Sequence, residues 1–490
     1  MRTLSKFIYL LSAASFTIWG CSDGKSKPVS KKETPNILII LADDMGYGDP
    51  SSFNPESKIS TPNIDRLAGE GIKFTNAHAA GPWCVPSRYG LLTGRFPFRN
   101  EREYSNSMIS SERLTIGKFL QQSDYQTACI GKWHQGIIDE KNPVKGVRLN
   151  GGPVDKGFDY YFGIPASLDI PPYYYIENDH YVDYPSDSIG DSSTKGWSPI
   201  QGEFWRKGMI SPGFQHKNVL SFLSGKVNDY LDDYDQSKKE KPFFMYFAMT
   251  APHTPWLPEK MFKGKSGAGM YGDFVMQSDY YIGTVLQKLD DLGLSENTLV
   301  LFASDNGPVW FPDNVSKYGH NSVGSLSGMK SDVLEGGHRM PFIVRWPGHI
   351  EKQSESDAIV SFTDIIATVA DILEKPLPKD SAEDSFSFLP LLKGKKDNLR
   401  PPVIITNNGI FSITYKHWKY INGKGPGGFT NMIMEKFPNI LPRDEYDGQL
   451  YNLSEDIGER HNLYAENPEK VKELSDLLDV YIKKPTRPIK

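Results

Sequence analysis

Ile37-Leu38-Ile39-Ile40-Leu41-Ala42-Asp43-Asp44 is a short apolar run that ends in two acidic residues. A continuous run of this length, rich in β-branched side chains, is typical of a strand that is buried on both faces of a parallel sheet. In open sheets of this kind, ligands bind beyond the carboxyl ends of the strands. The run therefore predicts a central strand that carries Asp43 and Asp44 to the edge where a ligand binds.

Other segments of the chain extend this pattern into a fold. Further apolar runs with the composition of buried strands are Thr127 to Ile130, Phe243 to Met249, Thr298 to Phe302 and Phe342 to Trp346. Helical patterns lie between them, such as one that Thr61 can cap, that Pro62 begins and that Gly71 ends. Strands that alternate with helices predict an α/β fold with a large, mostly parallel sheet between helices.

Polar residues follow three of these runs, as Asp43 and Asp44 follow the first. They are Lys132 and His134, then His253, then Asp305 and Asn306. We expect all of them to converge at one edge of the sheet. Asp43, Asp44, Asp305 and Asn306 offer hard oxygen ligands, which favour Ca²⁺ or Mg²⁺ over zinc. Each pair alone is also compatible with a local role in a helix cap or a turn.

Cys84 begins the segment Cys84-Val85-Pro86-Ser87-Arg88-Tyr89-Gly90-Leu91-Leu92-Thr93-Gly94. Pro86 suits the first turn of a helix that runs to about Leu92, which places Cys84 at the positive helix N-terminus, where backbone N–H groups receive anions. Arg88, one turn later, can direct its guanidinium to the same place. A buried cysteine that merely starts a helix is the alternative interpretation.

The segment from Cys84 to Gly94 resembles the type I sulfatase signature, in which the leading cysteine is oxidised to formylglycine. Gly131-Lys132-Trp133-His134 is similar to the second sulfatase signature. The resemblance continues in order through His253, Ser304 to Gly307, Lys330, and Glu335 to Pro341. It covers roughly residues 35 to 395 and implies an alkaline-phosphatase-like sulfatase fold with sulfuric ester hydrolase activity.

The resemblance also implies a role for each matching residue. Cys84, as a hydrated formylglycine, would be the nucleophile and a ligand of one Ca²⁺ ion, with Mg²⁺ less favoured, together with Asp43, Asp44, Asp305 and Asn306. Arg88, Lys132 and Lys330 would complete the catalytic group, the two lysines by binding sulfate oxygens. His134 would deprotonate the second hydroxyl to release sulfate, and His253 would protonate the leaving alcohol. A formylglycine-generating maturation enzyme is then a required partner.

Four residues are candidates for contacts with the substrate: Ser167, His320, His338 and Arg339. Tyr173, Tyr174, Tyr175 and Trp205 could stack on sugars, but aromatic clusters of this kind more often serve packing. The expected substrate is a sulfated carbohydrate, either a glycosaminoglycan or an algal polymer such as ulvan or carrageenan. A phosphate or phosphonate ester hydrolase of the same superfamily, and an inactive carbohydrate-binding lipoprotein, are the competing hypotheses.

The N-terminal residues read as an export signal. Arg2 and Lys6 precede an apolar run too short to span a membrane, so residues 1–20 are predicted to be a cleaved signal peptide. Cys21 then follows a lipobox-like sequence, and 21–35 would be a lipidated tether. We expect an exported bacterial lipoprotein, facing the periplasm or the cell surface at the outer membrane, whose lipid anchor is its only membrane contact. An ordinary signal peptide with an incidental cysteine is the alternative.

The rest of the chain completes the domain plan. Residues 36–395 are predicted to be the catalytic domain, and 396–490 a smaller subdomain with an antiparallel sheet and a final helix at roughly 468–482. Cys129, in an apolar run, is expected to be a small core residue. A formal net charge of −5 and scattered basic residues argue against a nucleic-acid partner.

Overall fold

The computed structural model describes residues 34–100, 107–138, 143–198, 200–237, 240–396, 400–441 and 446–483. From Thr34 onward the chain forms one compact unit. The predicted signal peptide, Cys21 and nearly all of the tether lie outside the described residues, so these predictions stay predictions.

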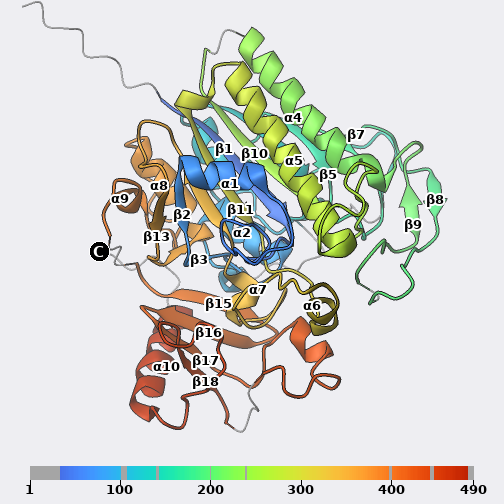
Figure 1. Cartoon of the computed structure of the whole chain (residues 1–490). Coiled ribbons are helices and arrows are strands. Elements are labelled where there is room, and N and C mark those ends of the chain that lie inside the picture. The colour runs from blue at the N-terminus through green and yellow to red at the C-terminus, as the bar shows by residue number, and fades with distance from the viewer. Residues whose placement is uncertain are drawn as a thin grey trace, which may run out of the picture. The chain divides into compact units, whose positions relative to one another are not determined.

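A ten-stranded mixed sheet forms the centre of the described chain (Figure 1). Its strands, in spatial order, are β13 (Ser354–Ser356), β2 (Ile72–Phe74), β12 (Phe342–Arg345), β11 (Thr298–Ser304), β1 (Asn36–Asp43), β10 (Phe243–Pro252), β4 (Gln126–Lys132), β5 (Tyr160–Ile164), β6 (Ile176–Glu177) and β7 (His180–Tyr181). The middle of the sheet, from β11 to β5, is parallel, whereas β12 runs antiparallel to β11. The predicted, mostly parallel sheet is therefore confirmed.

β1 is the strand between two hydrophobic cores. Its side chains alternate between them: Ile37, Ile39 and Leu41 face one core, whereas Leu38 and Ile40 face the other. All eight residues of β1 are buried, because helices cover both faces of the sheet. This burial on both sides explains why the strand is a continuous apolar run instead of an alternating one.

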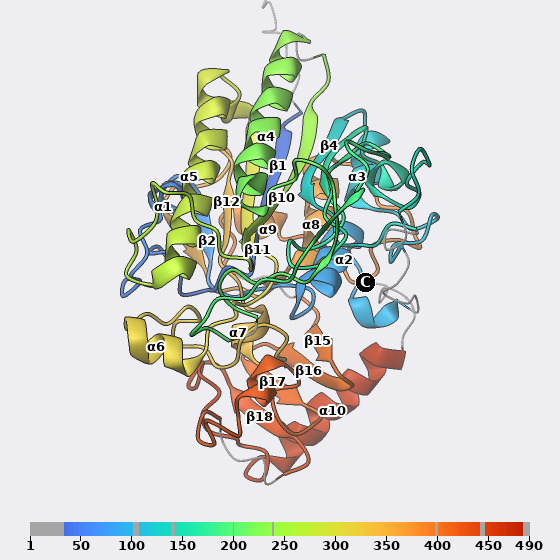
Figure 2. The same cartoon turned by 90° about the vertical axis from the view of Figure 1, so that its right-hand side faces the viewer.

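Helices cover the two faces of the sheet, as Figure 2 shows. One face is covered by α1 (Pro62–Glu70), α4 (Val219–Gln236) and α5 (Gly269–Asp291), and the other by α2 (Cys84–Thr93), α3 (Ile116–Gln121), α8 (Ile365–Ile372) and α9 (Leu389–Leu392). Cys129 on β4 is completely buried in the core on the α2 side, which confirms its predicted place.

The start of α1 differs from the prediction. Thr61 precedes the helix, but its Oγ1 accepts a hydrogen bond from Ser51 N. The N–H groups of Asn63 and Ile64 instead donate to the carboxylate of Asp279 on α5, at 3.1 and 2.8 Å. A carboxylate at a helix N-terminus satisfies free N–H groups and favours the helix dipole. The cap thus comes from a helix that is distant in sequence, which local patterns do not reveal.

A four-stranded antiparallel sheet follows the main sheet in sequence and lies below it in Figure 1. It comprises β15 (Val403–Asn407), β16 (Ile410–Tyr415), β17 (Trp418–Ile421) and β18 (Gln449–Asn452), and α10 (Pro468–Lys483) packs on it. The predicted antiparallel sheet and final helix are confirmed. The domain boundary at 395/396 stays a prediction, because the contacts place both sheets in the single unit that begins at Thr34.

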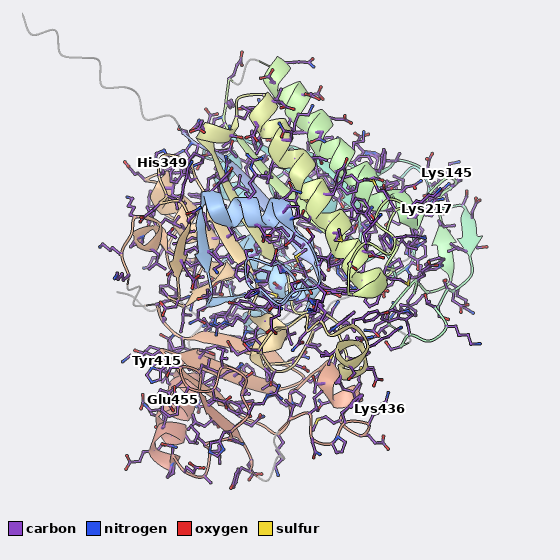
Figure 3. The ribbon with its side chains drawn as sticks, in the orientation of Figure 1. Lys145, Lys217, His349, Tyr415, Lys436 and Glu455 are labelled. Atoms are coloured by element: carbon purple, nitrogen blue, oxygen red, sulfur yellow. The ribbon has the colours of Figure 1, made fainter. Side chains whose placement is uncertain are left out.

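Shorter elements connect these layers. They are the paired strands β3 (Ala77–His78) with β14 (Val360–Ser361) and β8 (Asp187–Ile189) with β9 (Gly208–Ile210), the helices α6 (Pro312–Tyr318) and α7 (Glu335–His338), and short 3₁₀ turns. Figure 3 shows Lys436 on the side of α6, where its ammonium pairs with Asp313, and Tyr415 on the opposite side of the C-terminal sheet. Among the helices in the described ranges, none has both the length and the apolar character that a membrane crossing requires.

Candidate active site

Cys84 is the first residue of α2, a helix in which every residue is buried. Its side chain points into the protein, with Sγ 3.7 Å from Asp43 Oδ1, and only 2% of the residue is exposed. The helix ends where Gly94 adopts a left-handed conformation with φ 66° and donates its N–H to Gly90 O. The structure therefore places Cys84 at a helix N-terminus and directly beside the first strand end.

The acidic residues meet because β1 and β11 are adjacent parallel strands that end together. Ala42 and Ser304 are in register, so Asp43 and Asp44 leave β1 opposite Asp305 and Asn306. Asp44 N donates to Asp305 Oδ1 at 3.2 Å, and Asn306 Nδ2 donates to Asp44 Oδ1 at 2.6 Å. Asp44 has φ 65°, a left-handed conformation that aspartate tolerates better than most residues. The structure thus brings together all four predicted oxygen donors.

Three buried cations balance these carboxylates. Arg88 donates from Nε and Nη2 to Asp305 Oδ2 at 3.0 and 2.7 Å. Lys132 Nζ lies 2.7 Å from Asp43 Oδ2, and Lys330 Nζ lies 2.7 Å from Asp44 Oδ2. Each acidic side chain at the centre therefore has a basic partner.

Gly131 allows the strand that carries Lys132 to approach its neighbour closely. Its φ is 121°, and a Cβ atom there would lie 1.8 Å from Ala248 O of β10. No other residue fits this position without moving the strand. The glycine in the Gly131-Lys132 pair thus has a packing reason next to the side chain that binds Asp43.

The charges within this group shift the pKa values of Asp43 and Lys330. Burial alone would raise the pKa of Asp43, but Lys132, His253 and Arg88 outweigh it and hold the pKa well below the usual value. Burial would lower the pKa of Lys330, yet the Asp44 carboxylate raises it above the ordinary value. Asp43 is therefore ionised and Lys330 protonated at neutral pH.

The two predicted acid–base histidines both lie near the charges of this group. Burial, together with Lys132 and Arg88, holds the pKa of His134 well below its usual value, so its ring is neutral. Its Nδ1 is 3.5 Å from Ser167 Oγ, which places this predicted substrate residue next to it. Burial and Lys330 lower the pKa of His253, but Asp44 and Asp43 overcome both and raise it to about 9.

Asp169 belongs to this site although the sequence did not single it out. Only 6% of Asp169 is exposed, and its Oδ1 lies 4.0 Å from His253 Nδ1. Its Oδ2 pairs with Arg206, whereas Oδ1 finds no hydrogen-bond partner within the described ranges. In the sequence, only the neighbouring candidate Ser167 pointed to this segment. Asp169 belongs to no motif, and the tertiary structure brings it close to His253.

His320 and His338 do not have the predicted place at the substrate. His320 is 1% exposed, and its Nε2 and Nδ1 lie 2.8 Å from Asp49 Oδ1 and 3.4 Å from Lys58 N. His338 is fully buried, and its ring nitrogens contact His78 and Val333 O. The prediction of sugar contacts is wrong for both, because their ring nitrogens are already occupied inside the protein.

Arg339 is also held inside the fold. Its Nε donates to Thr75 O at 2.7 Å, and its Nη1 donates to Glu335 Oε2 at 3.0 Å. It lines a cavity of about 910 Å³ together with residues of the C-terminal sheet, such as Tyr415. The structure thus turns Arg339 towards the junction of the two sheets, and its predicted contact with substrate stays a prediction.

The aromatic residues considered as sugar platforms serve packing instead. Tyr173 and Tyr174 are 2% and 0% exposed. Tyr175 packs against Phe214, and Trp205 stacks on His216 at a ring distance of 4.8 Å. Their packing role is confirmed.

The oxygen donors fit a divalent cation. Asn306 Oδ1 is buried and has no hydrogen-bond partner in the described part of the chain, although buried polar atoms are normally satisfied. The ligand atoms of Asp43, Asp44, Cys84 and His253 all lie within 4.8 Å of one another. Carboxylate and amide oxygens are the donors that Ca²⁺ prefers. A hard cation bound between these carboxylates would give the free oxygen of Asn306 a partner.

Comparisons with known proteins agree with this geometry. The family described as "Sulfatase" matches residues 35–375, and the family described as "N-sulphoglucosamine sulphohydrolase, C-terminal" matches residues 330–484. The chain belongs to the sulfatase family. As a sulfatase it is a sulfuric ester hydrolase, and its fold is the alkaline-phosphatase-like one that the sequence predicted.

Individual relatives of this sulfatase cover between 74% and 98% of it. A protein of Bacteroides thetaiotaomicron named N-acetylgalactosamine-6-O-sulfatase is 35% identical over 98% of this chain and 99% of its own length. Human N-acetylgalactosamine-6-sulfatase is 32% identical over 74% of this chain and 67% of its own. A solved Bacteroides thetaiotaomicron structure from work on the metabolism of multiple glycosaminoglycans has a TM-score of 0.80 and 34% identity, and covers 92% of this chain and 100% of its own.

A more distant likeness bears on the competing hypothesis of phosphonate ester hydrolysis. The phosphonate monoester hydrolase of Agrobacterium radiobacter shares the fold with a TM-score of 0.60, but only 16% of the sequence. That likeness shows a common scaffold alone.

Proposed function

We propose that this sulfatase removes the 6-O-sulfate of N-acetylgalactosamine in saccharides derived from glycosaminoglycans. The observation that carries the chemistry is the buried centre in which Cys84 Sγ lies 3.7 Å from Asp43, with Lys132 and Lys330 on the neighbouring carboxylates. The choice of sugar and sulfate position rests on the relative that is 35% identical over 98% of the chain. Structures linked to carrageenan are only 23% identical, so they support the fold and not an algal substrate.

The group that acts is proposed to be formylglycine, made from Cys84 by a maturation enzyme, with one Ca²⁺ held by Asp43, Asp44, Asp305 and Asn306. A hydrated formylglycine supplies a hydroxyl nucleophile that a thiol does not replace, and Ca²⁺ lowers the pKa of such a hydroxyl and neutralises sulfate charge. The free Oδ1 of Asn306 supports the cation. The full burial of α2 supports a nucleophile that is protected from side reactions.

Lys132 and Lys330 are proposed to bind the sulfate oxygens. An ammonium group has three hydrogens to donate, and the recorded carboxylate contact uses one of them. Both lysines stand beside Asp43 or Asp44, the carboxylates nearest Cys84, so their remaining hydrogens can reach an anion at that residue. Arg88 is proposed to fix Asp305, to which it donates twice.

The two histidines are proposed to divide the proton transfers. Nδ1 of His253 lies 2.6 Å from Thr254 O, which fixes that nitrogen as a donor and leaves Nε2 on the side of Asp44 at 3.6 Å. With a raised pKa, His253 holds a proton to give to the leaving sugar alcohol. His134, neutral at this pH, is the base that accepts a proton when sulfate is released, and Ser167 can orient its ring.

The substrate proposal is tested by sulfate release from a matched panel of monosaccharides. We expect the highest kcat/KM for N-acetylgalactosamine 6-sulfate, and at least about tenfold less for N-acetylglucosamine 6-sulfate and N-acetylgalactosamine 4-sulfate, because a misplaced hydroxyl or sulfate leaves buried polar groups unmatched. The matched 6-phosphate tests the phosphate ester hypothesis. Faster turnover of another sulfated sugar would replace the proposed substrate, and faster turnover of the phosphate would replace the reaction.

The nucleophile is tested by Cys84→Ala. We expect kcat to fall by about 10⁴-fold or more, because the covalent route is lost, while circular dichroism and the unfolding midpoint stay close to those of the wild type. Cys129→Ala is the matched control, since Cys129 is a fully buried residue of the hydrophobic core and should keep kcat. Turnover that survives Cys84→Ala would remove Cys84 from the mechanism.

Export and lipid attachment at Cys21 are also proposed, and they rest on the sequence alone. Mass spectrometry of protein purified from its native host reads both modifications in one experiment. A formylglycine at Cys84 and a lipid on Cys21 are expected. An unmodified Cys84 peptide would contradict the proposed nucleophile, and an unmodified Cys21 would leave an ordinary signal peptide.

A further inference from the structure

The backbone around Lys330 is held by the two loops that build the centre. Lys330 N donates to Pro308 O at 2.9 Å, and Pro308 lies two residues after Asn306. Ser331 N donates to Pro82 O at 2.6 Å, and Pro82 lies two residues before Cys84. The peptide before Lys330 is thus tied to the loop of Asn306, and the peptide after it is tied to the loop that precedes Cys84.

Ser331 has φ 76°, which is uncommon for a residue other than glycine. Such a conformation persists only where the surroundings hold it in place. Ser331 N is held by Pro82, but its carbonyl group points to a different part of the chain. That partner comes from the C-terminal sheet.

Asn407, the last residue of β15, is the partner of that carbonyl. Its Nδ2 lies 2.7 Å from Ser331 O, 3.0 Å from Ser331 Oγ and 3.0 Å from Gly427 O, so the amide joins the Lys330 segment to a loop of the C-terminal sheet. Asn407 is separated from Ser331 by 76 residues in sequence. The contact is therefore made by the tertiary structure.

Gly428 closes the other side of the same peptide. A Cβ atom at Gly428 would lie 2.1 Å from the carbonyl carbon of Ser331, so only glycine lets the loop come this close. The next residue of the segment, Asp332, accepts hydrogen bonds from Thr430 N at 3.2 Å and from Thr430 Oγ1. The Lys330 segment is thereby enclosed by the C-terminal sheet and its loop.

We propose that Asn407 is a positioning residue for the reaction. By fixing the Ser331 carbonyl, it keeps the left-handed turn after Lys330, and this turn places Lys330 Nζ 2.7 Å from Asp44. The C-terminal sheet then contributes to sulfate binding through the backbone, without touching the substrate. The inference rests on the proposed role of Lys330 in sulfate binding.

The alternative is that Asn407 only stabilises the fold. Asn408 offers a matched control, because its Nδ2 donates to the same Gly427 O at 2.9 Å but belongs to the turn after β15. Asn408 has φ 49°, so Asn408→Gly removes the amide without adding backbone strain. Both variants lose a hydrogen bond to Gly427, and only Asn407→Ala loses the one to Ser331.

The experiment measures kcat/KM with N-acetylgalactosamine 6-sulfate and the inhibition constant of inorganic sulfate, at a temperature where all variants are folded. Asn407→Ala should lower kcat/KM and weaken sulfate inhibition by about tenfold to a hundredfold, because small displacements of a binding group have effects of this size. Asn408→Gly should stay within about twofold of the wild type, even with a similar loss in unfolding midpoint, since its amide donates to Gly427 O and not to Ser331.

A double-mutant cycle with Lys330→Ala separates positioning from stability. If Asn407 acts through Lys330, then Asn407→Ala should change kcat/KM by less than about twofold in the Lys330→Ala background, since coupled residues are not additive. Full additivity would overturn the inference, and so would unchanged sulfate inhibition in Asn407→Ala. If Lys330→Ala itself keeps its activity, the proposed role of Lys330 fails and the inference fails with it. A Lys330→Ala defect without an Asn407→Ala defect rejects the positioning role alone.

Discussion

Within the described part of the chain, two groups of buried histidine and acidic side chains could hold a metal ion, and they differ in how their charge is balanced. The first contains Asp43, Asp44, Cys84 and His253, and the second contains His78, Glu335 and His338. The ligand atoms within each lie close enough together to hold a metal ion. Their residue types alone therefore do not tell which group is the catalytic centre.

Lys419 distinguishes the second group. Its ammonium, from β17, lies 2.9 Å from both Glu335 Oε1 and Glu459 Oε1 and is completely buried. His78 Nδ1 and His338 Nδ1 lie 3.0 Å apart, so the histidines satisfy each other. We interpret this group, the Lys419 network, as structural, because the chain itself provides the cation at its centre.

The centre beside Cys84 is different because an oxygen donor is left over. Lys132, Lys330 and Arg88 pair with its carboxylates, yet Asn306 Oδ1 finds no hydrogen-bond partner among the residues described. In the Lys419 network, Glu459 Oε1 also lacks a hydrogen bond, but it lies 2.9 Å from the Lys419 ammonium. A buried polar atom without a hydrogen-bond partner is costly unless a ligand satisfies it. A cluster of titratable residues is therefore not enough to identify the catalytic centre. A buried oxygen that still lacks a partner, such as Asn306 Oδ1, identifies it better.

The largest expected effect is on the Lys419 network. Lys419→Met should lower the free energy of unfolding by about 3–5 kcal/mol, because it leaves buried carboxylates without their cation. Lys330→Met should lower it less in saturating Ca²⁺, since a divalent cation would compensate Asp44. Urea unfolding measures both, and equal losses in the two variants would contradict the difference between the groups. Adding Glu335→Gln to Lys419→Met should restore part of the stability.

Removal of the metal should act on the first group alone. Chelation with EGTA should lower the free energy of unfolding by about 2.7 kcal/mol relative to protein in Ca²⁺ at a hundred times its dissociation constant. It should also abolish sulfate release until Ca²⁺ is added back. Thermal unfolding measures the shift, which should shrink in Asn306→Ala and stay unchanged in Lys419→Met. A midpoint that does not respond to chelation would remove Ca²⁺ from the proposal.

The smallest expected effect is a pH dependence in the Lys419 network. Burial lowers the pKa of His78 to about 3, with Arg339 and Lys419 acting in the same direction and Glu335 opposing them. The unfolded chain then binds more protons than the folded one below the ordinary pKa of histidine, near 6.5, so stability falls as pH decreases from about 6.5 towards 3. One such group contributes about 1.4 kcal/mol per pH unit in this window.

His78→Gln isolates that contribution. Burial raises the pKa of Glu459 to about 7, which has the opposite sign because its stability contribution is lost as pH rises towards 7. The quantity to measure is therefore the difference in unfolding free energy between wild type and variant at each pH. Between pH 6.5 and 5 it should change by about 2 kcal/mol in the direction that disfavours the wild type at low pH. A constant difference would show that His78 titrates normally.

The central fold and most of the active centre could be predicted because their signals are local. The apolar run from Ile37 to Leu41 is a buried strand, and parallel strands must bring their carboxyl ends to one edge, so Asp43, Lys132, His253 and Asp305 had to converge. The helix position of Cys84 follows from Pro86 in the same way. These features depend on neighbours in sequence or on one rule of sheet geometry.

The places where prediction failed have the opposite character. His338 follows a conspicuous double glycine and His320 is a histidine of a polar loop, but Asp49 and His78 contact their ring nitrogens from distant parts of the chain. The cap of α1 comes from Asp279, more than two hundred residues away. Long-range contacts of this kind leave no periodicity or spacing in the sequence.

The amino-acid sequence alone therefore determined which chemical groups meet beside Cys84, because each of these residues directly follows a recognisable buried strand. Only the tertiary structure decided which of two similar buried clusters is free to take a cation, and that the strand ending in Asn407 holds the backbone next to Lys330. The physical reason is that both depend on which single atoms remain unsatisfied or come within hydrogen-bond distance. Such distances are set by packing between elements that are far apart in sequence.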